Sequence, residues 1–462
     1  MIRFDAIIIG AGQAGPPLAG RLTAAGMTVA LAERKLFGGT CVNTGCMPTK
    51  TLVASAYAAH LARRGRDFGV VLDGGFHVDM ARVKARADAV TASARASVEQ
   101  GLRDMAGCTV IEGHARFEAS DRVRVGDQLL TAPRIFINAG GRAIVPDMPG
   151  IADVSYLTNG SILALDRVPR HLVVVGGSYV GLEFAQMYRR FGAEVTIVEK
   201  GAHLIAREDA EVTAAVRAIL AGEGITVRTG AECINVARHE RGDVKVSMDC
   251  TEGEPEVVGS HVLLAVGRRP NTDDLGLDRA GIATDGRGYI SVDEGLATNV
   301  PGVWALGDCN GRGAFTHTAY NDFEIVAANL LDGKRRQVSH RIPAYALYID
   351  PPLGRVGMTE GQARASGRPL LIGQRPMSRV SRAIEKGETQ GFMKVVVDAE
   401  TRRVLGAAIL GTGGDEAIHG VLDIMNAGVP YEVLQHAVPI HPTVSELIPT
   451  MLGEMQPATS SE

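Results

Sequence analysis

The sequence predicts an α/β protein with two βαβ units, followed by a C-terminal region of α+β character. The first observation is a glycine-rich turn directly after a short apolar strand near the N-terminus. The second is a similar turn after an apolar strand that begins at His171, and the third is a change after Arg341 to strand-like and then helix-like segments. At 462 residues the chain is too long for one hydrophobic core, so about two to four domains are expected.

The first βαβ unit is expected over residues 4–33. A strand ending at Ile9 leads into a Gly-x-Gly-x-x-Gly turn, a helix to about Gly26 and a second strand ending at Glu33. In this motif the first glycine makes a tight turn, the second lets backbone N–H groups reach a pyrophosphate, and the third lets helix and strand pack closely. Glu33 lies 23 positions after the first glycine, where an acid can bind a ribose 2′-hydroxyl. The unit predicts a Rossmann-type dinucleotide site formed by Gly10, Gly12, Gly15 and Glu33.

A second βαβ unit is expected from His171 to Glu199. Its strand leads into the turn at residues 176–181, in which serine stands where the middle glycine usually lies. The acid that ends its second strand again follows the first glycine by 23 positions. Two such units in one chain are a more specific signal than one. The predicted second dinucleotide site consists of Gly176, Ser178, Gly181 and Glu199.

Two cysteines, Cys41 and Cys46, lie five positions apart directly after the first unit. If a helix begins near Cys46, its dipole favours the thiolate, and Lys50 faces the same side one turn later. Two close cysteines can also be buried thiols or metal ligands. Zinc sites generally use a gap of two to four residues with a second Cys/His pair elsewhere, and no such pair is evident. A dithiol that opens and closes therefore stands beside these simpler alternatives, and no metal site is predicted.

Composition excludes several classes of function. The net charge of −4, without a basic block, argues against nucleic acid or an anionic membrane surface as partner. No apolar run reaches transmembrane length, and the N-terminus has no signal-peptide layout. Six cysteines are too few for a disulfide scaffold, so we expect a cytoplasmic protein whose only functional disulfide would join Cys41 and Cys46.

Later segments complete the domain plan. Asp308 follows a short buried strand, at the sheet edge where α/β folds bind ligands, and a helix from about Ala319 to Leu331 returns the chain to the first domain. The last feature is His441, followed by Pro442 and, five positions after His441, by Glu446. The expected divisions are residues 1–145 with 268–340, residues 146–267, residues 341–455 and a flexible tail over 456–462.

Together these motifs resemble the flavin-dependent pyridine nucleotide–disulfide oxidoreductases, a family that includes dihydrolipoamide dehydrogenase, glutathione reductase and mercuric reductase. The resemblance covers about residues 4–450 in the right motif order, and the block Gly-Gly-Thr-Cys-x-Asn-x-Gly-Cys-x-Pro-x-Lys at 38–50 is its most specific part. It implies an FAD-binding domain over 1–145 and 268–340, an NAD(P)-binding domain over 146–267 and a dimerisation domain over 341–455. It also implies a homodimer with active sites shared between subunits.

The resemblance implies a role for each matching residue. Cys46 would lie against the flavin, while Cys41 would be the outer thiol that attacks substrate. Lys50, paired with Glu183, would lie near flavin N5, and Tyr179 would cover the nicotinamide pocket and swing away. His441, held by Glu446, would be the acid–base in the partner subunit's site, and its bond to Pro442 is expected to be cis. The FAD site would comprise Gly10, Gly12, Gly15, Glu33, Gly39, Thr40, Gly140 and Asp308; the nicotinamide dinucleotide site would comprise Gly176, Ser178, Gly181, Glu199 and Gly267.

The expected function is an FAD-dependent NAD(P)H:disulfide oxidoreductase that passes electrons to the Cys41–Cys46 disulfide and on to a small-molecule disulfide. One alternative is a mercuric-reductase-like enzyme that reduces a soft metal ion such as Hg or Cu with the same dithiol. Mercury itself is disfavoured because no cysteine follows Cys309 and no N-terminal CxxC metal-capture domain is present. A second alternative is a redox-sensing flavoprotein. The acid at Glu199 favours NADH over NADPH, although Lys200 and Arg207 could accept a phosphate.

Overall fold

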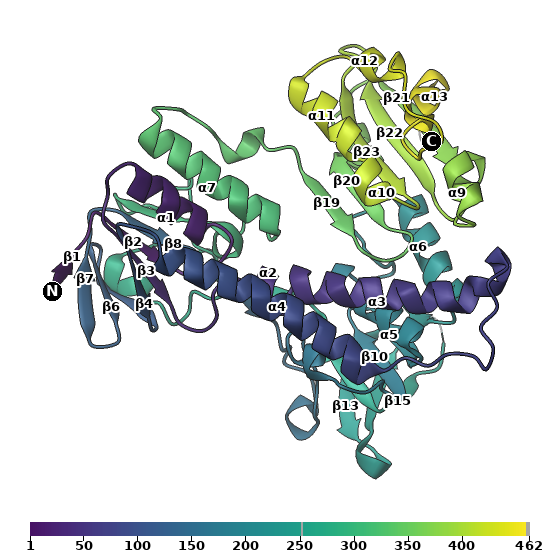
Figure 1. Cartoon of the computed structure of the whole chain (residues 1–462), viewed down its shortest axis with the longest axis horizontal. Helices are drawn as coiled ribbons and strands as arrows, with labels where there is room; N and C mark the ends of the chain where they lie inside the picture. The colour runs from purple at the N-terminus through teal and green to yellow at the C-terminus, as the bar shows by residue number, and fades with distance from the viewer. Residues whose placement is uncertain (251–252, 459–462) are drawn as a thin grey trace.

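The structure is a computed structural model that describes residues 1–250 and 253–458, and it has three regions, each with its own main β-sheet (Figure 1). The first two regions contain parallel sheets, which correspond to the predicted βαβ units, and the third contains an antiparallel sheet with helices. The predicted α/β class with an α+β region at the C-terminal end is confirmed.

The N-terminal parallel sheet positions the first glycine-rich turn. Its strands are short and, apart from the edge strand that begins at Cys108, almost wholly buried, as expected when both faces of a parallel sheet are covered. In spatial order they are β18 (Val303–Ala305), β8 (Ile135–Ile137), β2 (Ala6–Ile9), β3 (Val29–Glu33) and β4 (Cys108–Glu112). The helices α1 (Gly15–Ala24) and α7 (Thr316–Leu331) pack together beside it. Pro16 and Pro17 lie in the first turn of α1, where backbone N–H groups have no intrahelical partner, so the helix forms without a break.

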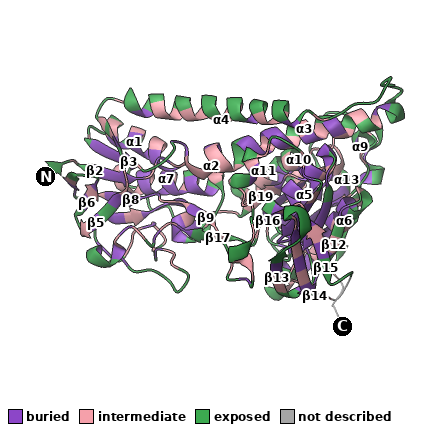
Figure 2. Ribbon diagram, turned by 90° about the horizontal axis from the view of Figure 1, so that it is seen from below, coloured by how far each residue is buried: buried purple, intermediate pink, exposed green. Residues whose placement is uncertain are grey.

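A helical hairpin carries the two close cysteines. It consists of α2 (Gly39–Thr44), α3 (Cys46–Arg64) and α4 (Met80–Arg103). In Figure 1, α4 and α3 extend from the N-terminal sheet to the middle region. Figure 2 shows that the outer side of α4 is mostly exposed, so the hairpin faces solvent on that side.

A small sheet, antiparallel except for the parallel pair β1–β7, flanks the first region. It consists of β1 (Ile2–Arg3), β7 (Gln128–Thr131), β6 (Arg122–Val125) and β5 (Ala115–Ala119), in that spatial order. Val125 is opposite Gln128, so Gly126 and Asp127 form a two-residue hairpin turn between β6 and β7.

The middle region repeats the βαβ plan. Its parallel sheet has the order β12 (Thr226–Arg228), β11 (Glu194–Val198), β10 (His171–Val175) and β16 (His261–Leu264). The helices are α5 (Tyr179–Phe191) and α6 (Ala210–Gly222), and a second sheet contains β13 (Glu232–Arg238), β14 (Val244–Asp249) and β15 (Glu256–Gly259). The chain enters and leaves this region through two adjacent strands, β9 (Gly141–Ala143) and β17 (Arg268–Pro270), which pair antiparallel. This pairing explains how a second unit can be inserted into the first.

The C-terminal region is an antiparallel sheet with short helices. Its strands are β19 (Ala344–Leu347), β20 (Leu353–Gly357), β23 (Val404–Leu410), β22 (Phe392–Asp398), β21 (Leu370–Pro376) and β24 (Gln456–Pro457), in that spatial order. The helices are α8 (Glu360–Ala365), α9 (Ser381–Glu385), α10 (Gly414–Ala417), α11 (His419–Ala427), α12 (Glu432–Gln435) and α13 (Leu447–Gly453).

The structure differs from the prediction at the tail. A flexible tail was expected from residue 456, but Gln456 and Pro457 pair with Ile372 and Leu371 of β21. An unpaired edge strand leaves backbone groups without partners, and β24 covers part of that edge. The rest of the predicted tail, residues 459–462, lies outside the described residues.

Neither a membrane span nor a metal-binding cluster is found in the described part of the chain. None of its helices is both long and apolar enough to cross a bilayer. Within residues 1–250 and 253–458, no three His, Cys, Asp or Glu side chains gather in a way that could hold a metal ion.

Candidate active site

The two close cysteines meet where α2 ends and α3 begins. Cys41 lies within α2, and Cys46 is the first residue of α3, as the sequence predicts. The helices are separated only by Gly45, at which a Cβ atom would lie 2.9 Å from the carbonyl oxygen of Thr40. A side chain at that position would therefore push the two helices apart. Both cysteines are free thiols in this structure, Cys41 half-buried and Cys46 exposed.

The charge of the dithiol is expected on Cys46. A hydrogen bond from the Cys41 thiol lowers the pKa of Cys46 to about 6, with further help from the Thr316 hydroxyl and the charge of Lys50. The same hydrogen bond, together with burial, raises the pKa of Cys41. Near neutral pH the pair therefore holds one proton on Cys41 and one negative charge on Cys46.

Thr316 was not predicted to be a site residue, yet its side chain reaches the dithiol. Its Oγ1 atom lies 3.3 Å from Sγ of Cys46, and it is the first residue of α7. Because Thr316 is 270 positions from Cys46, no local pattern could have indicated this contact.

Replacing Thr316 by valine is expected to raise the pKa of Cys46 by about half a unit to one unit, because one hydrogen bond to the thiolate is lost. The measurement is the pH dependence of alkylation at Cys46, followed by mass spectrometry in a Cys41→Ser background. Thr316→Ser keeps the hydroxyl and serves as the control. Equal midpoints for valine and serine would contradict this role of the hydroxyl.

Lys50 and Glu183 form an ion pair beside the dithiol. Nζ of Lys50 donates to Oε2 of Glu183 at 2.7 Å, and the backbone N–H of Tyr348 donates to Oε1 of Glu183 at 3.0 Å. Lys50 also lies over the Tyr348 ring, 4.6 Å from its centroid. The pair joins α3 to α5, and so it fixes a cation where the hairpin meets the second βαβ unit.

The first glycine-rich turn has the shape of a dinucleotide cradle. Gly10 has φ +107°, and a Cβ at Gly15 would lie 2.3 Å from the Gly10 carbonyl oxygen. A Cβ at Gly39 would lie 2.8 Å from Cα of Gly12, so the hairpin also approaches the turn closely. Glu33 accepts hydrogen bonds from the backbone N–H groups of Ala11 at 2.9 Å and Lys35 at 2.8 Å. Backbone bonds hold this carboxylate at the turn, as a ribose-binding acid requires.

Asp308 lies at the carboxyl end of the same sheet, just beyond β18. Burial raises the pKa of its carboxyl, and its nearest cation is Arg268, whose Nε is 3.6 Å from Oδ2. Arg268 also donates to the hydroxyl of Thr40 at 3.2 Å, and Gly140, with φ +67°, accepts from Asn271 next to β17. Arg268 thus connects Asp308 to Thr40, the residue directly before Cys41. The residues present fit an FAD.

The second turn reproduces the first. Gly176 has φ +115°, and a Cβ at Gly181 would lie 2.1 Å from the Gly176 carbonyl oxygen. Glu199 accepts from the backbone N–H groups of Gly177 at 2.5 Å and Gly201 at 2.6 Å, the counterpart of the bonds made by Glu33. Gly267, with φ +123°, follows the neighbouring strand β16. Ser178 directly precedes α5 in extended conformation and makes no side-chain cap bond to the helix.

Tyr179 is the first residue of α5, one helical turn before Glu183. Its hydroxyl donates to Oε1 of Glu208 at 3.2 Å, and its ring meets the edge of Tyr345 at a centroid distance of 5.5 Å. Tyr345 in turn stacks on Phe315, the residue before Thr316. The Tyr179 side chain is therefore connected by direct contacts to both the second turn and the region of the dithiol.

His441 and Glu446 are paired, and the bond to Pro442 is cis, as expected. Nδ1 of His441 lies 2.9 Å from Oε2 of Glu446, which leaves Nε2 as the ring nitrogen for proton transfer. The imidazole is 75% exposed and lies on the surface of the C-terminal region. No contact within the described residues joins it to the cysteines of the same chain, and an exposed, oriented imidazole suits approach to another subunit.

Three further residues near the site were not predicted as site residues: Glu208, Phe315 and Tyr345. They reach the site only through contacts between distant segments, which a local pattern does not show. Next to them, Nε2 of His317 donates to the carbonyl oxygen of Ala344 at 2.7 Å, and its ring stacks on Phe315.

Comparison with known proteins agrees with this geometry. Residues 4–322 match the family model for pyridine nucleotide-disulphide oxidoreductases, and residues 343–452 match that of their dimerisation domain. The chain is 36% identical to the probable pyridine nucleotide-disulfide oxidoreductase RclA of Escherichia coli strain K12, over 96% of this chain and 98% of the relative. It is 32% identical to a mercuric reductase of Bacillus cereus, over 96% of this chain and 70% of the relative. A solved structure described as the Cu(II) complex of the HOCl-induced flavoprotein disulfide reductase RclA from Escherichia coli matches with a TM-score of 0.89 at 35% identity, over 98% of this chain and 99% of the other.

Proposed function

The chain belongs to the pyridine nucleotide–disulphide oxidoreductases and is an FAD-dependent enzyme of that class, and from this premise we propose how its own residues divide the reaction. We propose that it uses NADH to keep Cys41 and Cys46 reduced and that this dithiol reduces a small-molecule disulfide. The observation that carries the proposal is the geometry of the dithiol. Cys41 and Cys46 lie where α2 meets α3, the Thr316 hydroxyl is 3.3 Å from Sγ of Cys46, and the Lys50–Glu183 ion pair lies beside them. When bound, the flavin supplies two-electron transfer between the coenzyme and the dithiol.

Because Cys41 carries a proton, the reaction with a disulfide needs a base. Because only the thiolate attacks a disulfide, a base must first remove the Cys41 proton, and we assign this role to His441 of the partner subunit. Sulfur of Cys41 then bonds to one substrate sulfur, and the other substrate sulfur leaves and takes the proton from the imidazolium. Cys46 attacks the sulfur of Cys41 and forms the Cys41–Cys46 disulfide. The second substrate sulfur is released as a thiolate, which takes a proton from solvent. The substrate gains two electrons and the dithiol loses two.

The remaining assignments follow the geometry of each group. Lys50, held by Glu183, places a positive charge near Cys46, and Tyr179 covers the nicotinamide pocket. A dimer is required if the exposed His441 is to serve another chain's dithiol, and the dimerisation-domain match favours that arrangement. We place the reaction in a reducing, cytoplasmic setting, because six cysteines in 462 residues are too few for a disulfide scaffold.

NADH is expected to be the better coenzyme, by about tenfold in kcat/KM, because the carboxylate of Glu199 accepts a ribose 2′-hydroxyl and repels a 2′-phosphate. Both oxygens of Glu199 are already held by backbone N–H groups, so the charge cannot easily move aside. Glu199→Ser should bring the NADH-to-NADPH ratio of kcat/KM closer to one. Glu194→Ser, which removes an exposed acid at the start of β11, should leave that ratio unchanged. An equal or higher kcat/KM for NADPH in the unaltered enzyme would refute the preference.

Reduction of a soft metal ion is the second candidate. One of the similar structures is described as a Cu(II) complex, and thiolates are soft ligands that suit copper and mercury. The deciding experiment measures NADH oxidation with a panel of small disulfides and, separately, with Cu(II) and Hg(II). Turnover that depends on a disulfide supports the proposal; turnover with the metal ions alone would favour the second candidate, and no turnover with either would refute both.

A further inference from the structure

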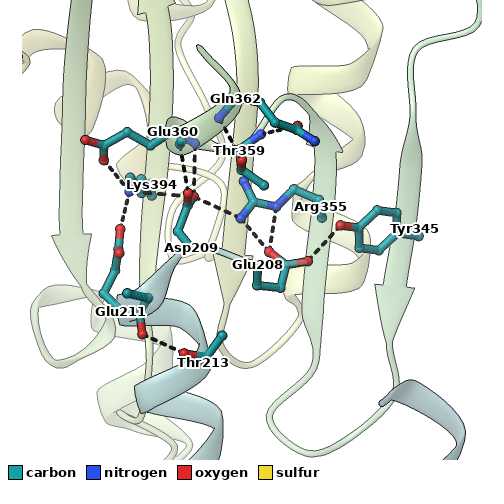
Figure 3. A network of polar contacts seen from close by, with 12 residues as sticks. Glu208, Asp209, Glu211, Thr213, Tyr345, Arg355, Thr359, Glu360, Gln362 and Lys394 are labelled. Atoms are coloured by element: carbon teal, nitrogen blue, oxygen red, sulfur yellow. Dashed lines mark hydrogen bonds and ion pairs between the residues drawn. The ribbon is translucent and has the colours of Figure 1, made fainter. Parts of the chain in front are cut away.

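A network of buried charges joins the second βαβ unit to the C-terminal sheet (Figure 3). Arg355 on β20 and Lys394 on β22 have side chains that are only 1% and 2% exposed. They meet Glu208 and Asp209, which lie just before α6 and belong to the middle region. Charges so deeply buried are costly unless paired, so each of these positions is tightly determined by its partners.

Glu208 is held at both carboxylate oxygens from the C-terminal side. Nε of Arg355 donates to Oε2 at 2.9 Å and Nη2 donates to the same oxygen at 2.5 Å. The hydroxyl of Tyr345 on β19 donates to Oε1 at 2.7 Å. The Glu208 side chain is completely buried, so no solvent competes for these bonds.

Asp209 holds Arg355 in turn. It accepts from Nη2 of Arg355 at 3.2 Å and from the backbone N–H groups of Glu360 and Gly361 at 3.1 Å each. Lys394 adds an ion pair to Glu360 at 2.5 Å, so α8 is tied into the same cluster. The place of Glu208 is thus fixed by three strands and one helix of the C-terminal region.

Tyr179 is the remaining partner of Glu208. Its hydroxyl shares Oε1 with Tyr345, and its bond of 3.2 Å is the longest that Glu208 makes with these three side chains. Burial raises the pKa of the Tyr179 phenol, so the group stays protonated and can donate. If one bond in this set opens, it is this one, because the others are shorter and Arg355 is only 1% exposed.

We propose that Glu208 is a positioning residue that holds the Tyr179 ring closed over the nicotinamide pocket, and that Arg355 and Tyr345 fix Glu208 for this purpose. The inference rests on the proposed function, in which Tyr179 covers that pocket. The ring must move for the nicotinamide to enter, so the Tyr179–Glu208 bond is broken during binding. A population held closed lowers the apparent affinity in proportion to the fraction that is open. The C-terminal region therefore sets how readily the coenzyme enters a pocket in another domain.

The test compares two ligands on the oxidised, FAD-loaded enzyme by titration calorimetry. NAD⁺ needs the ring to move, whereas ADP-ribose lacks the nicotinamide and does not. Tyr179→Phe and Glu208→Gln should each lower the Kd for NAD⁺ by about threefold to tenfold, the scale of one hydrogen bond to a charged acceptor, and change the Kd for ADP-ribose by less than about twofold. The double variant should bind NAD⁺ no more tightly than the single ones, because both remove the same bond.

A matched control lies on the same helix. The hydroxyl of Tyr188 donates to the carbonyl oxygen of Ile162 within the core, so Tyr188→Phe should leave both Kd values unchanged. Tyr179→Phe keeps the buried charges intact and tests the same bond should Glu208→Gln fold poorly. The proposal is overturned if Tyr179→Phe leaves NAD⁺ affinity unchanged, or if ADP-ribose affinity shifts by the same factor. If the unaltered enzyme binds neither ligand, the coenzyme site itself is refuted. That result differs from one in which both ligands bind but loss of the Tyr179–Glu208 bond has no effect.

Discussion

Replacing Cys41 by serine is expected to abolish disulfide reduction, with a loss of about 10⁴-fold or more, while NADH still reduces the bound flavin. The outer thiol is the atom that bonds to substrate, and removal of a covalent nucleophile acts on this scale. Rapid mixing under anaerobic conditions separates the two half-reactions, since flavin absorbance reports the first and thiol release the second. Turnover that survives in this variant would refute the dithiol mechanism.

Two other cysteine variants sharpen this result. In Cys46→Ser no thiol remains to attack the Cys41 sulfur, so treatment with a disulfide should leave half of the substrate bound to Cys41, detectable as added mass on that residue. Cys233→Ser removes an exposed thiol on β13 that has no part in the proposed reaction, and its activity should equal that of the unaltered enzyme. Loss of activity in that control would mean that serine substitution disturbs the enzyme generally.

The parts of this protein that sequence predicts well are those encoded by neighbouring residues. A Cβ would collide with backbone at four glycines of the two turns, so the glycine pattern in the sequence shows where the turns lie. These glycines are Gly10, Gly15, Gly176 and Gly181. The βαβ units can also be recognised in the sequence, because their buried strands are uniformly apolar. Local chemistry of this kind needs no knowledge of the rest of the chain.

The ends of elements depend on contacts that the pattern does not show. Helix α7 begins at Thr316, three positions before the predicted start near Ala319, because the hydroxyl of Thr318 accepts a hydrogen bond from the backbone N–H of Phe315 and stabilises an earlier first turn. This shift matters for the chemistry, since it brings Thr316 to the dithiol.

The contacts of Glu208 could not be predicted from the sequence for a different reason. Glu208 follows an ordinary-looking segment and meets Tyr345 from 137 positions away and Arg355 from 147 positions away. A buried acid at position 208 could not be predicted from the sequence, because acids are rarely buried without partners and these partners lie far away along the chain. Only the folded C-terminal sheet brings them to Glu208. By contrast, the Lys50–Glu183 pair spans 133 positions and was expected only because the family resemblance implied it.

His441→Ala is expected to slow disulfide reduction by about 10²–10⁴-fold, the usual effect of losing a general acid–base, without slowing flavin reduction by NADH. The loss should shrink as pH rises: the pKa of Cys41 is raised, so without a base its thiolate forms only in more alkaline solution. Glu446→Gln keeps the imidazole but weakens its orientation, and a smaller loss of about tenfold is expected. His436→Ala, a histidine nearby that has no assigned role, is the matched control. A loss under twofold in His441→Ala would refute the assignment.

Whether His441 acts on its own chain or on its partner can be decided by mixing defects. A heterodimer of one Cys41→Ser chain and one His441→Ala chain should recover close to half of the activity of the unaltered dimer, because one of its two sites then combines an intact Cys41 with His441 of the partner subunit. If the imidazole served its own chain, both sites would lack a group and the heterodimer would be inactive. The exposed position of His441, already oriented by Glu446 yet without contact to the cysteines of its chain among the described residues, favours the first outcome.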